Sequence, residues 1–231
     1  MLDIRNPPPL PLISVSILSA DFGKMAEECR DVLSQGADLL HLDVMDGHFA
    51  PNLTMGVDMC RALRRHFPDT CLDVHLMVER PDMFIGPFAD AGASHVSFHI
   101  EVCRPLRGGG LEAPKMIDAI HQRGMTAGLV INPRTDPAST AEYLREIDML
   151  LVMSVNPGYS GQKFMPEVLA TVRWVKERIG PRTRIEIDGG INVTTAREAV
   201  AAGVDVMVTA SALFSSSDRA GFLRQLHEAG K

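Results

Sequence analysis

Eight short apolar segments that alternate with eight amphipathic patterns predict an α/β fold, a single-domain (β/α)8 TIM barrel spanning residues 1–231. Strands that alternate with helices form parallel sheets, and 231 residues is a usual length for one such barrel. No linker composition divides the chain into two domains. Residues 1–11 contain Pro7, Pro8 and Pro9, so we expect a Pro-rich lead-in before the first strand.

The eight predicted strands are short and rich in aliphatic and β-branched residues. In chain order they cover residues 12–18, 39–45, 71–78, 95–101, 126–132, 149–155, 184–188 and 204–210. Runs of this length and composition, bounded by glycine, proline and polar residues, are typical of buried parallel strands.

The eight predicted helices follow these strands one by one. They cover residues 22–36, 57–67, 82–92, 114–124, 140–147, 166–180, 194–203 and 219–230. Glycine ends many of them, as expected of the residue that follows a helix: Gly36, Gly92, Gly124, Gly180 and Gly203.

Composition excludes several classes of protein. The net charge is -6 and no run of five or more lysines and arginines occurs, so we expect no nucleic-acid partner. No apolar run approaches the roughly 18 residues of a membrane span, and no signal peptide is recognisable. The four cysteines form no C-x-x-C pair. We therefore expect a cytoplasmic protein with reduced thiols and no membrane partner.

Polar side chains occupy alternate positions on three predicted strands. The aliphatic residues between them suit the side that faces the helices, so the polar ones point into the barrel. These inward residues are His41, Asp43, His75 and Asp188. Two imidazoles and two carboxylates in a cavity of low dielectric constant are costly unless something pairs them. One divalent transition metal (Zn, Fe, Mn or Co) would satisfy all four, and separate hydrogen-bonded core residues are the alternative.

Three glycine-rich turns follow the last three predicted strands, at residues 156–164, 188–192 and 209–214. Such barrels often bind phosphate with late loops and the N-terminus of a short helix. Backbone amides can hold a dianion without a lysine, which suits an acidic protein. The same face of the barrel therefore predicts a phosphate site.

A metal, two carboxylates on roughly opposite strands and a phosphate site predict proton abstraction beside the carbonyl of a sugar phosphate. The metal would polarise the carbonyl and stabilise an enediolate, while one aspartate removes the proton and the other returns it. Met45, Met77 and Met153 also point inward. They would line the planar intermediate with a polarizable apolar wall, or else fill the core.

Six motifs resemble the ribulose-phosphate 3-epimerase family: SVSILSADF, LLHLDVMDGHFAPNLTMG, DVHLMVERP, GLVINPRT, MSVNPGYSGQKFMPEVL and IEIDGG. The resemblance runs from about Ser14 to Phe214. It implies that D-ribulose 5-phosphate is inverted at carbon 3 to D-xylulose 5-phosphate by a homo-oligomer. It also implies that Asp43 and Asp188 are the acid/base pair and that His41, Asp43, His75 and Asp188 are the metal ligands.

The resemblance also implies which residues contact the sugar phosphate. They are Ser16, His75, Gly158, Tyr159, Ser160, Gly161, Gly189, Gly190, Ala210 and Ser211.

His99 and Glu101 share one face of the fourth predicted strand and are expected to form a hydrogen bond that supports the metal site.

This chain departs from the family pattern at two loops. The family usually shows NPGFGGQ where Tyr159 and Ser160 stand, and Gly-Ser where Ala210 and Ser211 stand. If the missing glycine is needed for a positive φ or for close approach of the phosphate, alanine would cost about 1 kcal/mol.

Three other functions are therefore considered. A D-allulose-6-phosphate 3-epimerase would share the metal site but take a longer substrate. A related decarboxylase would carry D-x-K-x-x-D, where this chain has Met45 in place of lysine. The third is a catalytically inactive sugar-phosphate-binding barrel.

Overall fold

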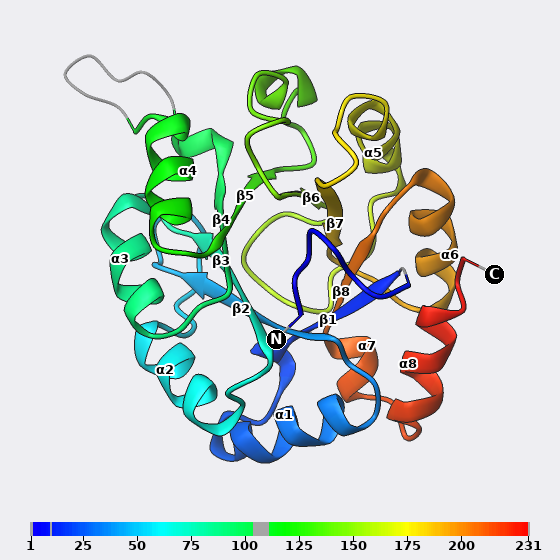
Figure 1. Cartoon of the computed structure of the whole chain (residues 1–231). Coiled ribbons are helices and arrows are strands. Elements are labelled where there is room, and N and C mark those ends of the chain that lie inside the picture. Colours follow the sequence, from blue (N-terminus) through cyan, green and yellow to red (C-terminus); the bar gives the residue numbers. More distant parts are fainter. Residues whose placement is uncertain (1, 10, 104–110, 231) are drawn as a thin grey trace.

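Eight parallel strands form a closed barrel in the computed structural model, which describes residues 2–9, 11–103 and 111–230 (Figure 1). The strands are β1 (Leu12–Ser16), β2 (Leu39–Met45), β3 (Cys71–Met77), β4 (His95–His99), β5 (Thr126–Ile131), β6 (Met149–Met153), β7 (Arg184–Asp188) and β8 (Val206–Thr209). Their order around the barrel follows the chain, and β8 pairs with β1. The predicted (β/α)8 barrel is confirmed.

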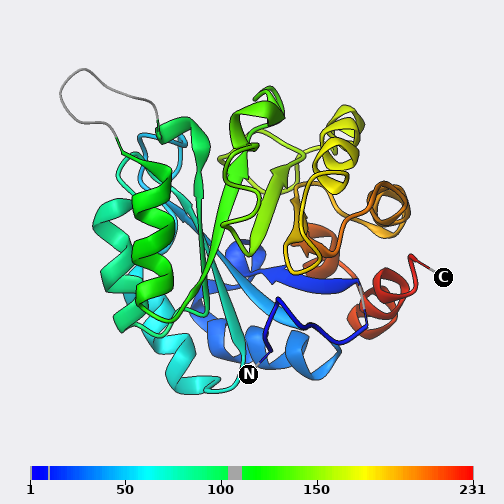
Figure 2. The ribbon, with the colours of Figure 1, turned by 45° about the horizontal axis from the view of Figure 1, so that its top comes forward.

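Helices surround the barrel on its outer side (Figure 1, Figure 2). They are α1 (Met25–Ser34), α2 (Val57–His66), α3 (Asp82–Asp90), α4 (Ala113–Gln122), α5 (Leu169–Lys176), α6 (Val193–Ala202), α7 (Ser211–Phe214) and α8 (Arg219–His227). Shorter 3-10 helices lie between them: η1 (Ile17–Ser19), η2 (Phe22–Lys24), η3 (Ile100–Val102), η4 (Pro137–Thr140) and η5 (Pro166–Val168).

Three local predictions were wrong. Residues 140–147 do not form an α-helix, because Tyr143 and Glu146 donate to carbonyls three residues back and the segment runs as successive turns. Gly180 lacks the positive φ of the other predicted helix ends, since it precedes Pro181 and α5 ends earlier, at Lys176. Some strand bounds also differ: β1, β4 and β6 end two residues earlier than predicted, the first two where η1 and η3 begin, and β8 begins two residues later.

The main apolar core lies between the strands and the helices. Outward side chains such as Leu40, Leu42 and Val74 are fully buried against the helical layer. Alternation leaves the opposite face of each strand to the barrel interior, where His41 and His75 are also fully buried.

The N-terminal segment covers one end of the barrel, in dark blue across its opening in Figure 1. Ile4 is 1% exposed and packs against the first residues of several strands, including Leu12 and Leu39. The guanidinium of Arg184 donates to the carbonyls of Ile4 and Arg5 at 2.9 and 2.8 Å. The amino ends of the strands are thereby covered, and the carboxyl ends remain accessible.

Candidate active site

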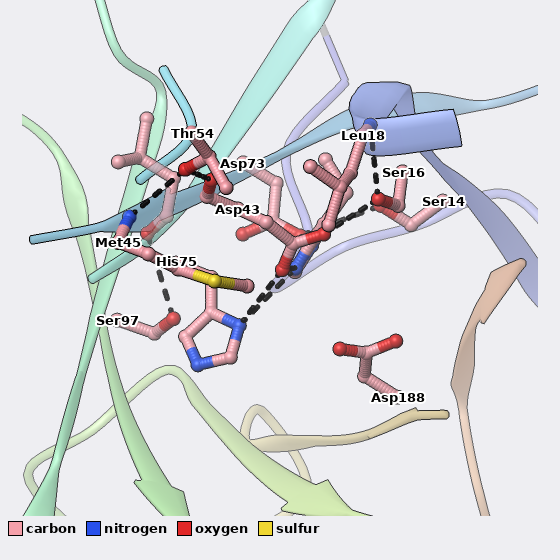
Figure 3. A network of polar contacts seen from close by, with 12 residues as sticks. Ser14, Ser16, Leu18, Asp43, Met45, Thr54, Asp73, His75, Ser97 and Asp188 are labelled. Carbon is pink, nitrogen blue, oxygen red and sulfur yellow. Dashed lines mark hydrogen bonds and ion pairs between the residues drawn. The ribbon is translucent and has the colours of Figure 1, made fainter. Parts of the chain in front are cut away.

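Four side chains from three strands converge at the carboxyl end of the barrel. His41 and Asp43 come from β2, His75 from β3 and Asp188 from β7, and their ligand atoms lie within 4.8 Å of one another. Asp43 and His75 are register partners, so their inward side chains lie side by side. The carboxylate of Asp188 points toward them from the opposite side (Figure 3).

This group of atoms fits a divalent metal. The Oδ1 atom of Asp43 lies 3.3 Å from His41 Nε2 and 3.3 Å from His75 Nδ1. It is buried and has no hydrogen-bond partner among the described residues. A buried carboxylate oxygen without a donor, beside two imidazole nitrogens and a second carboxylate, matches the mixed ligand set of a transition metal.

His41 is held from behind by a second carboxylate. Its Nδ1 lies 2.7 Å from Asp73 Oδ2, which also accepts from Ser14 Oγ at 3.4 Å. Burial alone lowers the pKa of His41, but the charges of Asp73 and Asp43 outweigh it and raise that pKa well above its usual value. Asp73 thereby orients the ring and leaves Nε2 facing the site.

Glu186 lies deeper in the barrel, beneath this contact. Its Oε1 is 3.9 Å from His41 Nδ1, and neither of its oxygens has a hydrogen-bond partner within the described ranges. Burial and the negative charge of Asp73 raise the pKa of Glu186 well above its usual value. A protonated Glu186 avoids a second negative charge beside Asp73 in the barrel interior.

The two candidate catalytic carboxyls have opposite protonation preferences. Burial would raise the pKa of Asp43, but the positive charge of His41, whose Nε2 lies 3.3 Å away, lowers it below its usual value. For Asp188, burial and the negative charge of Asp43 raise the pKa to about 7. Two facing carboxyls whose pKa values are driven apart are the pattern of an acid/base pair.

A cavity of about 680 Å³ opens above these residues. It is lined by these residues singled out from the sequence: Ser16, Asp43, Met45, Met77, Met153, Gly158, Tyr159, Ser160, Gly161, Asp188, Gly189, Gly190, Ala210 and Ser211. His41 and His75 do not line it, because both are fully buried below its floor. The structure therefore brings the predicted contact residues around one cavity, except His75, which lies below the floor beside Asp43.

Comparison with known proteins assigns the chain to a family. Residues 12–214 match the model of the ribulose-phosphate 3 epimerase family. The chain belongs to this family. It is 44% identical to the ribulose-phosphate 3-epimerase of Serratia marcescens over 211 residues, which are 90% of this chain and 97% of that protein. It is 42% identical to the enzyme of that name from Bacillus subtilis, over 90% of this chain and 94% of the other. Members of the family are isomerases.

Distant solved structures share the fold alone. The 3-hexulose-6-phosphate synthase of Salmonella typhimurium superposes with a TM-score of 0.67 at 18% identity, covering 95% of this chain and 98% of the other. Within the described ranges, no helix is both long and apolar enough to cross a bilayer.

None of the residues that depart from the epimerase pattern occupies the positive-φ region that favours glycine. Gly158 and Gly161 have φ of 140° and 78°, but no described residue other than glycine has a positive φ. Ser160 therefore needs no glycine conformation, and Ala210 has a φ of −138°. A positive φ, one condition under which alanine would cost about 1 kcal/mol, is therefore absent at Ala210.

Tyr159 forms a contact that the usual phenylalanine could not form. Its hydroxyl donates to the carbonyl of Pro51 at 2.6 Å, and Asn52 Nδ2 donates to the carbonyl of Gly158 at 2.8 Å. These bonds join the loop after β2 to the glycine-rich loop after β6 across the cavity mouth.

Sequence reasoning assigned no role to Asp73, Glu186 or Ser14. A signal existed for the first two, because Asp73 has the inward parity of His75 and Glu186 that of Asp188. The partners of Asp73 and Glu186 depend on which strands are neighbours and on the register between them. That register places Asp73 on β3 beside His41 on β2.

Proposed function

We propose that this chain is a metal-dependent ribulose-phosphate 3-epimerase that inverts carbon 3 of D-ribulose 5-phosphate to give D-xylulose 5-phosphate. The observation that carries the proposal is the pair Asp43 and Asp188, which face one cavity from β2 and β7 with opposite protonation preferences. The family and the names of its relatives agree with this activity.

Inversion beside a carbonyl needs one group that takes a proton from one face and another that delivers a proton to the opposite face. Asp43 favours the ionised form and is suited to accept. In the metal-free protein the pKa of Asp188 is about 7, so this carboxyl gains and releases a proton near neutral pH and is suited to deliver one to the substrate carbon. In the reverse reaction the two residues exchange roles. Ser16 Oγ donates to Asp43 Oδ2 at 2.5 Å and orients the acceptor.

His41, Asp43, His75 and Asp188 would hold one divalent transition metal: Zn, Fe, Mn or Co. When bound, the ion would polarise the substrate carbonyl and stabilise the negative charge that develops on its oxygen. Met45 and Met77, which pack together as register partners, would form with Met153 the apolar wall beside the reacting carbon and exclude water there.

The phosphate would bind at the far end of the cavity. The backbone amides of Gly158, Tyr159, Ser160 and Gly161 are proposed to hold it, with Gly189, Gly190, Ala210 and Ser211 completing the site. Added methyl groups at Gly189 and Gly190 would lie 2.6 Å from Val155 Cγ2 and from the Phe164 backbone nitrogen, so both positions require glycine for close packing.

D-allulose 6-phosphate is the second candidate substrate. Its phosphate would bind one carbon farther from the metal site than that of D-ribulose 5-phosphate, within the same cavity of about 680 Å³. A cytoplasmic location and a homo-oligomeric state remain predictions.

The test is proton exchange at carbon 3. Metal-analysed protein is incubated with D-ribulose 5-phosphate in deuterated water, and carbon 3 is followed by NMR. We expect deuterium incorporation with formation of D-xylulose 5-phosphate. Asp43→Asn and Asp188→Asn should each lower the rate by about 10²- to 10⁴-fold. Asp58→Asn, the same change at an exposed position of α2, should leave it unchanged.

Two results would contradict the proposal. Exchange with D-allulose 6-phosphate but not with D-ribulose 5-phosphate would assign the chain to the longer substrate. Exchange with neither sugar, in protein that holds its metal, would identify an inactive sugar-phosphate-binding barrel.

A further inference from the structure

We propose that Glu101 acts through His99 to present the Nδ1 lone pair of His75 to the metal, so that Glu101 and His99 are positioning residues of this site. The inference rests on the proposed metal site and concerns how that site is prepared. Three contacts carry it: Glu101 Oε2 lies 3.2 Å from His99 Nδ1, His99 Nε2 lies 2.9 Å from His75 Nε2, and His75 Nδ1 lies 3.3 Å from Asp43 Oδ1.

The direction of this hydrogen-bond chain is fixed at Glu101. Its Oε1 accepts from the backbone N–H of Asn132 at 2.8 Å and from the hydroxyl of Thr135, so its second oxygen faces His99. Burial alone would raise the pKa of Glu101, but the hydrogen bonds and charge at His99, with the other donors, lower it to about 2. An ionised carboxylate only accepts hydrogen bonds, so His99 Nδ1 must carry the proton.

The proton on His99 Nδ1 determines the state of His75. Two ring nitrogens 2.9 Å apart form a hydrogen bond only if one donates and the other accepts. A neutral His99 with its proton on Nδ1 accepts at Nε2, so His75 must donate from its own Nε2. The neutral ring of His75 then has its lone pair on Nδ1, directed toward Asp43. The reverse direction would place a proton on Nδ1 and block that nitrogen as a ligand.

Ring geometry agrees with this chain. The planes of His75 and His99 are 25° apart with centroids 5.0 Å apart, which is the spacing of nearly coplanar rings that meet through their nitrogens. His99 also contacts the ring of Phe49, with centroids 4.5 Å apart. His99 is 1% exposed, so water does not compete readily for its nitrogens.

The two candidate histidine ligands are therefore supported differently. His41 is bound directly by Asp73, whereas His75 is reached from Glu101 through one intervening ring. Because Asn132 and Thr135 hold Glu101, the loop after β5 takes part in preparing a ligand on β3. Loss of a hydrogen bond that holds a metal ligand in place typically lowers metal affinity by about 10- to 100-fold.

Glu101→Gln tests the inference. Glutamine has one acceptor oxygen in place of two, so it cannot accept from the β5 loop and from His99 at once. We expect Co²⁺ affinity, followed by visible absorption during titration of metal-free protein, to fall by about 10- to 100-fold. Nitrogen-15 NMR of the metal-free variant should show His75 losing its single Nε2–H tautomer. Glu112→Gln, the same change at a glutamate 59% exposed on its side chain beside Lys115, should leave both measurements unchanged.

Variants of His99 separate positioning from packing. His99→Gln can accept from His75 with its carbonyl oxygen and donate to Glu101 with its amide, so it should retain Co²⁺ affinity. His99→Phe fills the space without a nitrogen and should lose Co²⁺ affinity as Glu101→Gln does. Wild-type Co²⁺ affinity and an unchanged His75 tautomer in folded Glu101→Gln would overturn the inference and leave the proposed function standing. A wild-type protein that binds no metal would overturn both.

Discussion

Lowering the pH from 7 to 5 is expected to weaken metal binding at the candidate active site, because protons compete with the metal for its ligands. Burial and the charge of Asp43 raise the pKa of Asp188 to about 7. About half of the Asp188 carboxyls are then ionised at pH 7 and about one in a hundred at pH 5. Protonation of Asp188 alone predicts that the affinity for the metal falls about 50-fold from pH 7 to pH 5, with a slope that approaches tenfold per pH unit.

His41 makes the dependence of metal affinity on pH steeper. Its pKa is raised well above the usual value by Asp73 and Asp43 despite its burial, so metal binding must also displace a proton from this ring. The sign is the same for both groups: each is protonated in the metal-free protein at low pH and must lose its proton to bind. Affinity therefore rises with pH up to neutrality, and binding releases protons.

The assay is direct titration of metal-free protein with Co²⁺ at several pH values, read by visible absorption, in wild type and in Asp188→Asn. Asparagine does not titrate, so the slope of log affinity against pH should be shallower by about one unit in the variant below pH 7. Asp58→Asn should reproduce the wild-type slope. A flat wild-type profile from pH 7 to 5, or equal slopes in wild type and Asp188→Asn, would show that Asp188 does not exchange a proton for the metal.

Two further predictions concern the ends of the barrel. Tyr159→Phe removes only the hydroxyl that donates to the carbonyl of Pro51. Because the loss is equivalent to one net hydrogen bond, KM for the sugar phosphate should rise by roughly 2- to 10-fold, with little change in folding stability. An unchanged KM in steady-state assays would show that this bond does not shape the cavity mouth. Ile4→Ala should lower the free energy of unfolding, measured in urea, by about 2–5 kcal/mol and leave kcat unchanged, because Ile4 is buried at the end of the barrel opposite the site. The control is Leu53→Ala, which should change the free energy of unfolding little because Leu53 is 75% exposed. Equal losses in the two variants would argue against a stabilising role of Ile4 at the covered end of the barrel.

Much of the site followed from local pattern. His41, Asp43 and His75 alternate with aliphatic residues, and in a strand buried on both faces alternation alone decides which side chains enter the barrel. The structure places them as that alternation predicted, together with Asp188 from β7. The expected His99–Glu101 contact is also present, at 3.2 Å, because the two residues are close in the chain.

Other features depended on contacts that no local pattern encodes. Residues 140–147 have a helical pattern, yet they form turns that bury Leu144 and Ile147 before β6 begins. Ser160 and Ala210 raised a question of backbone strain that only their φ angles could answer. The cover that Ile4 provides at the far end of the barrel could not be foreseen from a run of prolines.

The (β/α)8 barrel and the inward residues of each strand could be predicted without a structure, because both depend on periodicities of a few residues along the chain. Three other features came from the folded barrel: Asp73 supports His41, Glu186 lies beneath them, and His75 lies below the cavity floor. Those facts depend on the register between neighbouring strands and on the depth of each layer in the barrel. They in turn set the burial and the neighbouring charges that drive the pKa values of Asp43 and Asp188 apart.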